Sequence, residues 1–359
     1  MELSKTGRCP NLNWTITDLD ISSDNKFAVH STLSPFVHMI NLEDATYTQQ
    51  FSLKNGNTNV EMADELFWFF SLRIYSLKLS GDNKEIIAGC GKALGGAPVQ
   101  IFDIETNQLK QSVFAHKEDI NSVCYVDRDN SSIFITASDD GVCKLWDTRI
   151  LKNFEPAGIF YGHVSGLTHV ESKNDNKYFL SNCKDQSAKL WDIRQSTTER
   201  KNYPFLKYDY RYEILSSHHI EQIKNYQKRF DQSVMSFWGH QVHSTLIRCH
   251  FSPLHGTNQR YIYSGSYDGR VYIYDTITGE NIVTLEIPND EDHDIKNQIV
   301  RDCAWHPYSQ QIISTNFHGE VLRWEYNDLR DAEAVLPENG LMEDENSMNV
   351  EIQKSMTNI

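Results

Sequence analysis

The sequence lacks an excess of positive charge, a long apolar run and a secretion signal. Lys and Arg number 34 against 49 Asp and Glu, so the formal net charge is −15. This balance argues against nonspecific binding to nucleic acid or an anionic membrane, because both need a positive face. The longest apolar run, residues 66–70, cannot cross a bilayer, and residues 1–5 lack a signal-peptide core. We expect a cytoplasmic or nuclear chain without a direct nucleic-acid or membrane partner.

The sequence also lacks the motifs of metal sites and catalysis. Its seven cysteines contain no CxxC pair, which argues against a zinc site and a disulfide framework. The glycine-rich residues 89–96 lack the Gly-Lys-Ser/Thr end of a phosphate loop and no helical pattern follows them. No nucleophile elbow or Ser/His/Asp ordering stands out. We therefore predict no catalytic, cofactor-binding or metal-binding residue and no enzyme activity; an active site built from loops is the remote alternative.

What the sequence does contain is a repeat. The tetrapeptide WDxR occurs at residues 146–149 and again at residues 191–194. A period near 45 residues that ends in Trp-Asp is typical of the WD40 β-propeller. A third copy ends at Tyr274 and Asp275, and a degenerate copy contains Ser314, His318 and Trp324.

A His, a hydroxyl residue and an Asp precede the Trp of the clear copies at matching spacing. We expect the imidazole to bridge the carboxylate and the hydroxyl, which in turn reaches the indole N–H, so that no buried donor lacks a partner. The predicted residues of this structural relay are His116, Thr136, Asp140 and Trp146, then His163, Ser181, Asp185 and Trp191, then His240, Ser264 and Asp268.

Alternating apolar residues over 16–53 and 74–114 predict two further blades of four short strands. The fold class is therefore all-β, a WD40 β-propeller with six visible four-stranded antiparallel blades over residues 14–326. Closed WD40 rings more often have seven blades, and closure removes exposed edges. We expect a seventh blade to be missing at the N-terminus, after which residues 1–13 form a short leader; a true six-bladed ring is the alternative.

Two segments fall outside the repeat pattern. Residues 195–232 form an insertion between the third and fourth strands of one blade, where Ile220, Ile223 and Tyr226 recur at helical spacing behind Ser217. A short amphipathic helix and a solvated loop are both compatible with this spacing. Residues 327–359 are acidic and predict a disordered tail.

The WDxR motifs also predict a surface. Relay His and Asp residues mark one end of the blades, and the third strand runs away from that end. Arg149 and Arg194 should therefore emerge at the opposite end on adjacent blades, with the insertion beside them. Simple pairing with a neighbouring carboxylate is the alternative role. Arginine suits a protein interface because its planar guanidinium is weakly hydrated and donates in a fork.

These motifs resemble those of the WD40 substrate receptors of cullin-4 RING ubiquitin ligases. Residues 184–194, 208–212, 239–249 and 300–307 are similar to the WD-repeat protein 23 family, the eleventh of the cullin-4-associated factors. The resemblance implies that the chain bridges the damaged-DNA-binding protein 1 adaptor and a client protein for ubiquitination. It implies adaptor-binding roles for Asp147, Arg149, Asp192 and Arg194. A general WD40 scaffold without a ligase role is the alternative.

Overall fold

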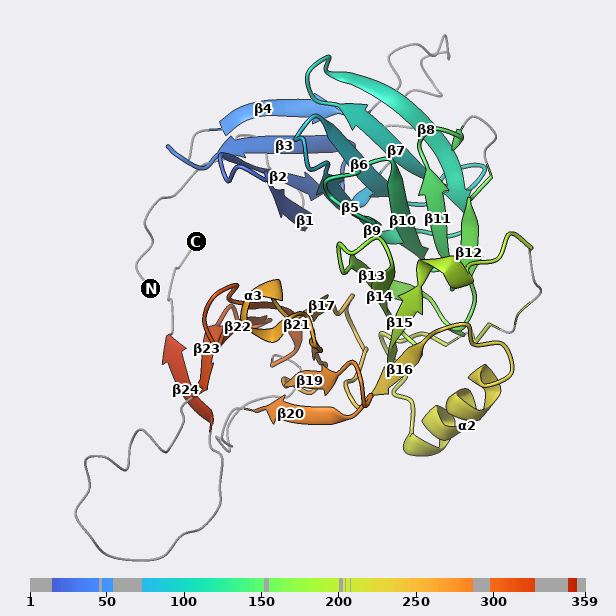
Figure 1. Cartoon of the computed structure of the whole chain (residues 1–359), viewed down its shortest axis with the longest axis vertical. Helices are drawn as coiled ribbons and strands as arrows, with labels where there is room; N and C mark the ends of the chain where they lie inside the picture. Colours follow the sequence, from blue (N-terminus) through green and yellow to red (C-terminus); the bar gives the residue numbers. More distant parts are fainter. Residues whose placement is uncertain are drawn as a thin grey trace, which may run out of the picture. The chain divides into compact units, whose positions relative to one another are not determined.

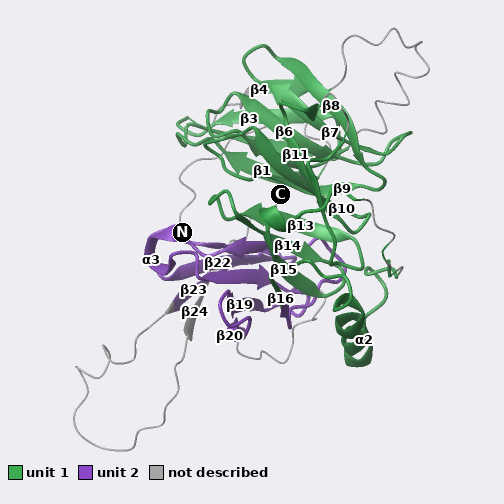
Figure 2. Ribbon diagram, turned by 45° about the vertical axis from the view of Figure 1, so that its right-hand side comes forward, with its two compact units in different colours: residues 1–236 green, residues 237–359 purple. Residues whose placement is uncertain are grey.

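The computed structural model of the chain describes residues 15–44, 47–53, 73–151, 155–199, 203, 205–206, 208–286, 298–326 and 348–353. The chain divides into two compact units, Met1–Ser236 and Phe237–Ile359 (Figure 2). None of the helices in the described residues is long and apolar enough to span a membrane.

The described strands form six four-stranded antiparallel sheets, each made of four strands that follow one another in the chain (Figure 1). This arrangement confirms the predicted all-β class with six visible blades. The first three blades consist of β1 (Ile16–Ile21), β2 (Phe27–Thr32), β3 (Phe36–Asn41) and β4 (Tyr47–Ser52); β5 (Ile74–Leu79), β6 (Glu85–Cys90), β7 (Ala97–Asp103) and β8 (Gln108–His116); and β9 (Ile120–Tyr125), β10 (Ile133–Ser138), β11 (Cys143–Asp147) and β12 (Gly158–Phe160).

The fourth blade contains the insertion, and the last two blades belong to the second unit. The strands of these three blades are β13 (Leu167–Ser172), β14 (Tyr178–Cys183), β15 (Ser187–Asp192) and β16 (Met235–Trp238); β17 (Cys249–Phe251), β18 (Tyr261–Gly265), β19 (Val271–Asp275) and β20 (Asn281–Leu285); and β21 (Val300–Trp305), β22 (Gln311–Asn316), β23 (Val321–Tyr326) and β24 (Met348–Gln353). The boundary between the two units falls within β16.

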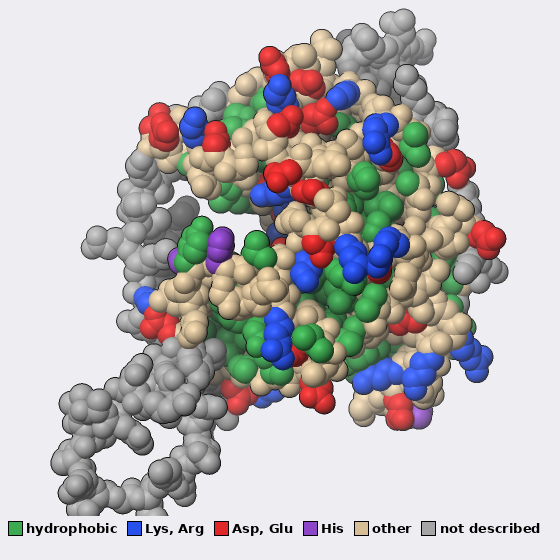
Figure 3. All heavy atoms as spheres, in the orientation of Figure 1, with side chains coloured by type: hydrophobic (Ala, Val, Ile, Leu, Met, Phe, Trp, Pro, Cys, Tyr) green, Lys and Arg blue, Asp and Glu red, His purple; other side chains and the backbone are tan. Residues whose placement is uncertain are grey.

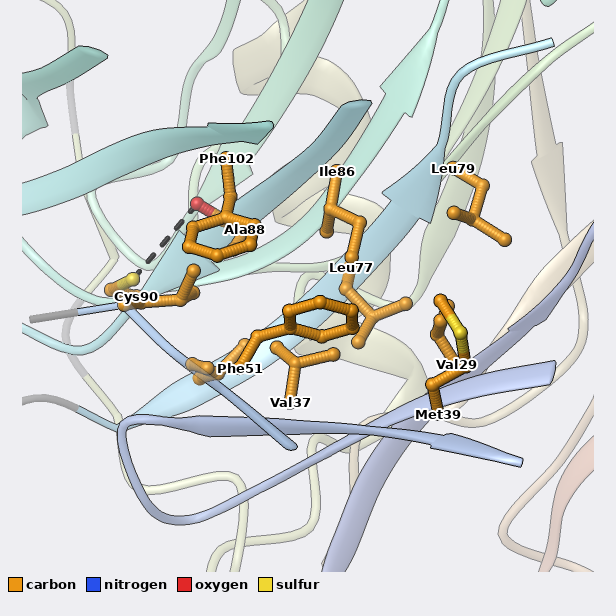
Figure 4. Packing of buried hydrophobic residues seen from close by; sticks show 12 residues of the cluster. Val29, Val37, Met39, Phe51, Leu77, Leu79, Ile86, Ala88, Cys90 and Phe102 are labelled. Atoms are coloured by element: carbon orange, nitrogen blue, oxygen red, sulfur yellow. Dashed lines mark hydrogen bonds between the residues drawn. The ribbon is translucent and has the colours of Figure 1, made fainter. Parts of the chain in front are cut away.

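Apolar side chains that alternate along the strands form the core between neighbouring blades. In the cluster of Figure 4, Val29 and Phe51 of blade one lie with Leu77 and Phe102 of blade two, and all four are fully or almost fully buried. The Phe51 and Phe102 rings meet edge to face with centroids 5.3 Å apart. Such packing fixes the register of a strand that has one apolar face, because a one-residue slip would turn that face away from the core.

In blades three to six, the turn between the second and third strands has one residue in the left-handed region. Gly141, Gly269 and Gly319 fill this position with φ values of 85°, 84° and 79°. Glycine is favoured there because it has no Cβ to clash with the backbone. In blade four the position is occupied by Gln186, with φ of 71°, and its side-chain amide donates to the Lys184 carbonyl at 2.8 Å.

The C-terminal segment differs in part from the disordered tail that its composition predicts. Its residues Met348–Gln353 form β24, which pairs antiparallel with β23 from Val321 opposite Gln353 to Tyr326 opposite Met348. The prediction of disorder is wrong for these six residues. Pairing with the edge of β23 uses backbone N–H and C=O groups, so it does not require an apolar side-chain pattern in β24. The remainder of the tail and the predicted leader, residues 1–13, lie outside the described residues.

Candidate protein-interaction surfaces

Blade three contains the hydrogen bonds that its relay motif predicts. His116 Nδ1 lies 2.9 and 3.0 Å from the two Asp140 oxygens, and Nε2 lies 2.6 Å from Thr136 Oγ1. The Trp146 indole N–H donates to the same hydroxyl at 2.9 Å. A single donor direction satisfies every group: the indole donates to Thr136, Thr136 donates to Nε2, and Nδ1–H donates to Asp140.

The equivalent chain in blade four is more deeply buried. His163 Nδ1 lies 2.9 Å from Asp185 and Nε2 lies 2.7 Å from Ser181, whose hydroxyl accepts from Trp191 Nε1 at 2.7 Å. His163 is 1% exposed and Asp185 is fully buried. The Asp185 carboxylate also accepts the backbone N–H groups of Val164 and Ser187, the Ser187 hydroxyl and the side-chain amide of Gln227. This carboxylate therefore organises the end of the blade at which the relay lies.

Burial and hydrogen bonding set the charge states of these groups. Burial lowers the pKa of His116 against the opposing effect of Asp140, so the imidazole is neutral at physiological pH. Burial by itself would raise the pKa of Asp140, but the interactions with His116 outweigh it and bring the pKa to about 2. For Asp185 the balance between burial and the His163 interaction also lowers the pKa. Both carboxylates are ionised acceptors.

The third relay copy differs from the prediction. His240 Nδ1 lies 2.9 Å from the Tyr274 hydroxyl, while Asp268 accepts from the Tyr272 hydroxyl at 2.8 Å. The Ser264 hydroxyl donates to backbone carbonyls. The predicted roles of Ser264 and Asp268 are therefore wrong. In this blade a tyrosine takes the place of the relay tryptophan. The Tyr274 hydroxyl contacts the His240 imidazole directly, so no serine or threonine is needed between the two side chains.

The degenerate copy keeps one contact of the motif, since Trp324 Nε1 donates to Ser314 Oγ at 2.9 Å. One group of possible metal ligands occurs in the described residues, formed by His163, Cys183 and Asp185. Both ring nitrogens of His163 are engaged by Asp185 and Ser181, and Cys183 Sγ lies 3.2 Å from the Ser165 carbonyl. Burial raises the pKa of the Cys183 thiol well above its usual value. The relay explains these contacts without a metal.

The two WDxR motifs form identical ion pairs at the other end of blades three and four. Arg149 Nε and Nη2 donate to the Asp147 carboxylate at 2.8 and 2.6 Å. Arg194 donates to Asp192 in the same way at 2.9 and 2.5 Å. Each carboxylate is largely buried, yet the arginine side chains are 68% and 69% exposed. Each Asp thus holds its guanidinium in one orientation while leaving most of it accessible.

Strand directions place this arginine pair away from the relays. Asp147 ends β11 and Asp192 ends β15, and both strands begin just after the relay Asp of their blade. Arg149 and Arg194 therefore lie at the end of blades three and four opposite to His116 and His163. We call these two residues the arginine pair. The pairing with neighbouring carboxylates that the sequence leaves as the alternative is present, and the guanidinium groups are exposed as well.

The insertion does not stay beside the arginine pair. It starts there with η2 (Ile193–Gln195), and Thr197 then bridges to Ile159 of β12. Further on, Tyr203 donates to the Asp140 carbonyl and the Leu206 N–H donates to the Val164 carbonyl. The prediction that the insertion lies at the arginine end is wrong, because its middle part covers the relay end of blades three and four.

The helix within the insertion is confirmed and tied to blade four. It is α2 (Ser217–Gln227), and its N-cap is Ser216 rather than Ser217, with the hydroxyl accepting from the His219 N–H. Of the residues at helical spacing, Ile223 is buried. Lys and Arg side chains gather over this part of the molecule (Figure 3). At the end of the helix, Gln227 donates to Asp185 at 2.8 Å.

A buried ion pair completes the attachment of the insertion. Lys189, in the middle of β15, has a fully buried side chain that donates to Asp231 at 2.5 Å and to Ser236 at 2.6 Å. No sequence pattern indicates the roles of Tyr203, Gln227 and Asp231. The repeat gives no signal for them because the insertion has no counterpart in the other blades.

Comparison with known proteins agrees with this geometry. The family model of the WD domain, G-beta repeat, matches residues 107–147, 154–192 and 231–275. Two solved structures, of U3-55K and of the RRP9 WD40 repeats, each superpose with a TM-score of 0.61 at 11% identity, over 88% of this chain and 78% of theirs. The chain is a WD40-repeat protein of the β-propeller class.

Two curated proteins are more similar in sequence to this chain than the solved structures are. The chain is 35% identical to the LEC14B protein of Lithospermum erythrorhizon over 88% of its length and 64% of that protein. It is 31% identical to the DDB1- and CUL4-associated factor 11 homolog of Caenorhabditis elegans, over 89% of its length and 53% of that protein. Its similarity to the factor 11 homologues agrees with the resemblance to the WD-repeat protein 23 family that the motifs predict. The chain spans between half and two thirds of the length of these relatives.

Proposed function

We propose that this protein is a nonenzymatic substrate receptor of a cullin-4 RING ubiquitin ligase. In this role the arginine pair binds the damaged-DNA-binding protein 1 adaptor, and another surface holds a client protein for ubiquitination. Relatives from Caenorhabditis elegans and Caenorhabditis briggsae are named DDB1- and CUL4-associated factor 11 homologues. The compartment that fits this role is the cytoplasm, the nucleus or both.

The observation that supports adaptor binding most directly is the shared geometry of the arginine pair. Arg149 and Arg194 are held by Asp147 and Asp192 through matching forked hydrogen bonds, and both stay about two-thirds exposed. A guanidinium fixed in this way loses little conformational entropy when a partner binds it. Charge-assisted hydrogen bonds from a desolvated arginine are among the strongest contacts at protein interfaces.

The mechanism would be positioning rather than chemistry. The adaptor end fixes the receptor on the ligase, and the client held elsewhere on the same molecule presents its lysines at a high effective concentration to the ubiquitin-loaded enzyme. Neither step requires a catalytic side chain in this chain. Asp147 and Asp192 act as positioning residues because each orients one arginine.

Affinity capture from cells tests the proposal. The wild-type chain should capture the adaptor and cullin-4, and the Arg149→Ala/Arg194→Ala variant should capture roughly tenfold less of both or none. Its melting temperature should stay nearly unchanged, because exposed ion pairs contribute little to stability. Arg149→Lys/Arg194→Lys keeps the charge but not the fork, and it should also bind poorly.

Arg211 provides the matched control. Arg211 is an exposed arginine of the insertion and lies beside Tyr210. Both residues lie at the relay end of the blades. Arg211→Ala should capture the adaptor at the wild-type level. Undiminished adaptor capture by the double alanine variant would refute the role of the arginine pair. Capture of another stable assembly by the wild type, without adaptor or cullin-4, would favour the general scaffold instead.

A further inference from the structure

The insertion forms a pocket at the relay end of blades three and four. Its cavity of about 560 Å³ lies within the range typical of ligand sites. One side is formed by loops of the blades, including Glu118, Asp139 and Gly166. The other side is formed by insertion residues, namely Phe205, Leu206, Tyr208, Asp209, Tyr210, Arg211 and Glu213. All of the lining residues belong to the first compact unit.

Acidic groups outnumber basic groups around this pocket. Among the described residues that line it, four are acidic, and the two basic ones are Lys184 and Arg211. Lys184 is largely buried and is already paired with Asp139 at 2.6 Å. Glu118 is about half exposed and pairs with Lys92 at 2.7 Å. Asp209 and Glu213 are exposed, and, Glu118 aside, the only other exposed charge among the described lining residues is Arg211. The two exposed acids against one exposed base favour a cationic group on the ligand.

Aromatic side chains form part of the pocket wall. Phe205, Tyr208 and Tyr210 line it, and the Lys184 ammonium lies 4.2 Å from the centre of the Tyr210 ring. The protein's own lysine thus already uses one carboxylate and one aromatic face of this site. A second cation with an aliphatic stem would find the same combination in the exposed carboxylates and the Phe205 and Tyr208 rings.

Apolar residues continue from the pocket onto the open surface. Phe205, Tyr212 and Ile214 of the insertion are 41%, 85% and 67% exposed. Large exposed side chains beside a polar cavity are typical of protein-binding surfaces. A small free cation would contact only the cavity, whereas a peptide could cover both the cavity and these neighbouring side chains. The surface therefore fits a peptide better than a small molecule.

We propose that this pocket binds an arginine or lysine side chain of a client peptide, whose neighbouring apolar residues pack on the exposed part of the insertion. Calling the peptide a client rests on the proposed ligase function, but the binding itself does not involve the adaptor. Burial raises the pKa of Asp139 despite its contacts with Lys184 and Asn121. An additional cation nearby would offset the cost of that burial.

Binding of fluorescein-labelled peptide pools to the purified full chain tests the inference. Each pool has one fixed central residue, Arg, Lys, Ala or Glu, flanked by random positions. The Arg and Lys pools should bind at least roughly tenfold more tightly than the Glu pool, and their binding should weaken as salt is raised. Equal binding of all four pools, or preference for the Glu pool, would overturn the proposal.

Substitutions of residues that line the pocket test whether the peptides bind there. Glu118→Gln/Glu213→Gln should lower the affinity for the Arg and Lys pools by roughly tenfold, and Phe205→Ala should lower it as well. Glu105→Gln, an exposed acid in the turn after β7, should bind like the wild type and serves as the control. Unchanged binding in the first two variants would place the peptide elsewhere and overturn the assignment.

The same measurement separates this inference from the proposed function. The Arg149→Ala/Arg194→Ala variant should bind the peptide pools normally, and Glu118→Gln/Glu213→Gln should still capture the adaptor. Failure of adaptor capture in the wild type would refute the ligase role and leave the peptide site standing. Absence of any charge preference among the pools would refute the site and leave adaptor capture unaffected.

Discussion

At the scale of single residues, Asp185 connects the blade to the insertion. Its carboxylate is fully buried. It accepts hydrogen bonds from the His163 imidazole, two backbone N–H groups, a serine hydroxyl and the Gln227 amide. A buried carboxylate is tolerated when hydrogen bonds replace its lost hydration. Removing it would leave several buried donors without an acceptor at once.

Asp185→Ala should lower the free energy of unfolding by about 3 kcal/mol, because the donors that it satisfies would stay buried and unpaired. Asp268→Ala is the matched comparison and should cost about 1 kcal/mol or less, since Asp268 is not part of a relay. Urea denaturation measures both values. The combined His163→Ala/Asp185→Ala loss should be smaller than the sum of the single losses. Equal losses for Asp185→Ala and Asp268→Ala would contradict the role given to the relay.

The relay of blade three should make stability depend on pH. The pKa of His116 is lowered in the folded protein, so the unfolded chain takes up a proton first as pH falls below about 6.5. Asp140 has a folded pKa of about 2 against 3.8 for the ordinary group, so it adds a second loss of stability between these values. Urea midpoints at pH 7, 5.5 and 3 should therefore fall steadily.

His116→Gln provides the control for this pH dependence. Its urea midpoint should start lower at pH 7 and change less between pH 7 and 5.5, because one group that titrates only on unfolding is gone. Other buried histidines remain, including His30, whose pKa burial and the neighbouring His38 lower to about 4. An identical slope in wild type and variant would mean that His116 does not contribute.

At the scale of elements, the insertion is attached by polar contacts and by aromatic packing of Tyr203 on Tyr161 of blade three. Its helix α2 buries Ile223 and Gln227, and the buried Lys189 of β15 reaches forward to Asp231. A close approach adds a steric constraint: a Cβ on Gly141 would lie 2.9 Å from the Tyr203 hydroxyl. The insertion therefore packs closely against the turns of blades three and four.

Asp231→Ala should destabilise the protein by about 3 kcal/mol or more, because it leaves the Lys189 ammonium buried without its carboxylate. Lys189→Met in the same chain should restore much of the loss, since an apolar side chain of similar length needs no counterion. Thermal melts of both variants, with limited proteolysis of residues 203–231, measure the effect. A double variant as unstable as Asp231→Ala would show that the ion pair is not the cause.

At the scale of the whole molecule, two different surfaces occupy opposite ends of blades three and four. The arginine pair lies where β11 and β15 end, and the pocket lies where the loops before β9 and β13 meet the insertion. The blades between them are held by packed apolar cores such as that of Trp191 with Phe160 and Phe179. A rigid spacer of this kind can hold two partners without relaying a conformational change.

Adaptor and peptide should therefore bind independently. The dissociation constant for the adaptor, measured by titration with and without a saturating Arg-centred peptide pool, should change by less than roughly twofold. The Glu118→Gln/Glu213→Gln variant, which should not bind the peptide, provides the baseline. A tenfold change would correspond to a coupling of about 1.4 kcal/mol and would mean that the blades transmit a change between the two ends.

The sequence by itself determined the blade architecture, because strand alternation and the relay spacing are local properties that repeat. The alternation within residues 16–53 predicts strands at 16–21, 26–31, 36–42 and 47–53, and β1 to β4 agree with these bounds to within one residue. The relays of blades three and four have the predicted hydrogen bonds. The sequence also placed Arg149 and Arg194, since strand direction follows from the order of the strands in a blade.

Only the tertiary structure decided where the insertion goes and what completes the last blade. Tyr203, Gln227 and Asp231 find partners in Asp140, Asp185 and Lys189, which lie 42 to 63 positions away in the chain. β24 pairs with β23 although it lies within the acidic C-terminal segment. Such contacts depend on which donors and edges the folded blades leave open, and a single sequence does not encode that in any local pattern. The pocket exists for the same reason, because its two sides become neighbours only after folding.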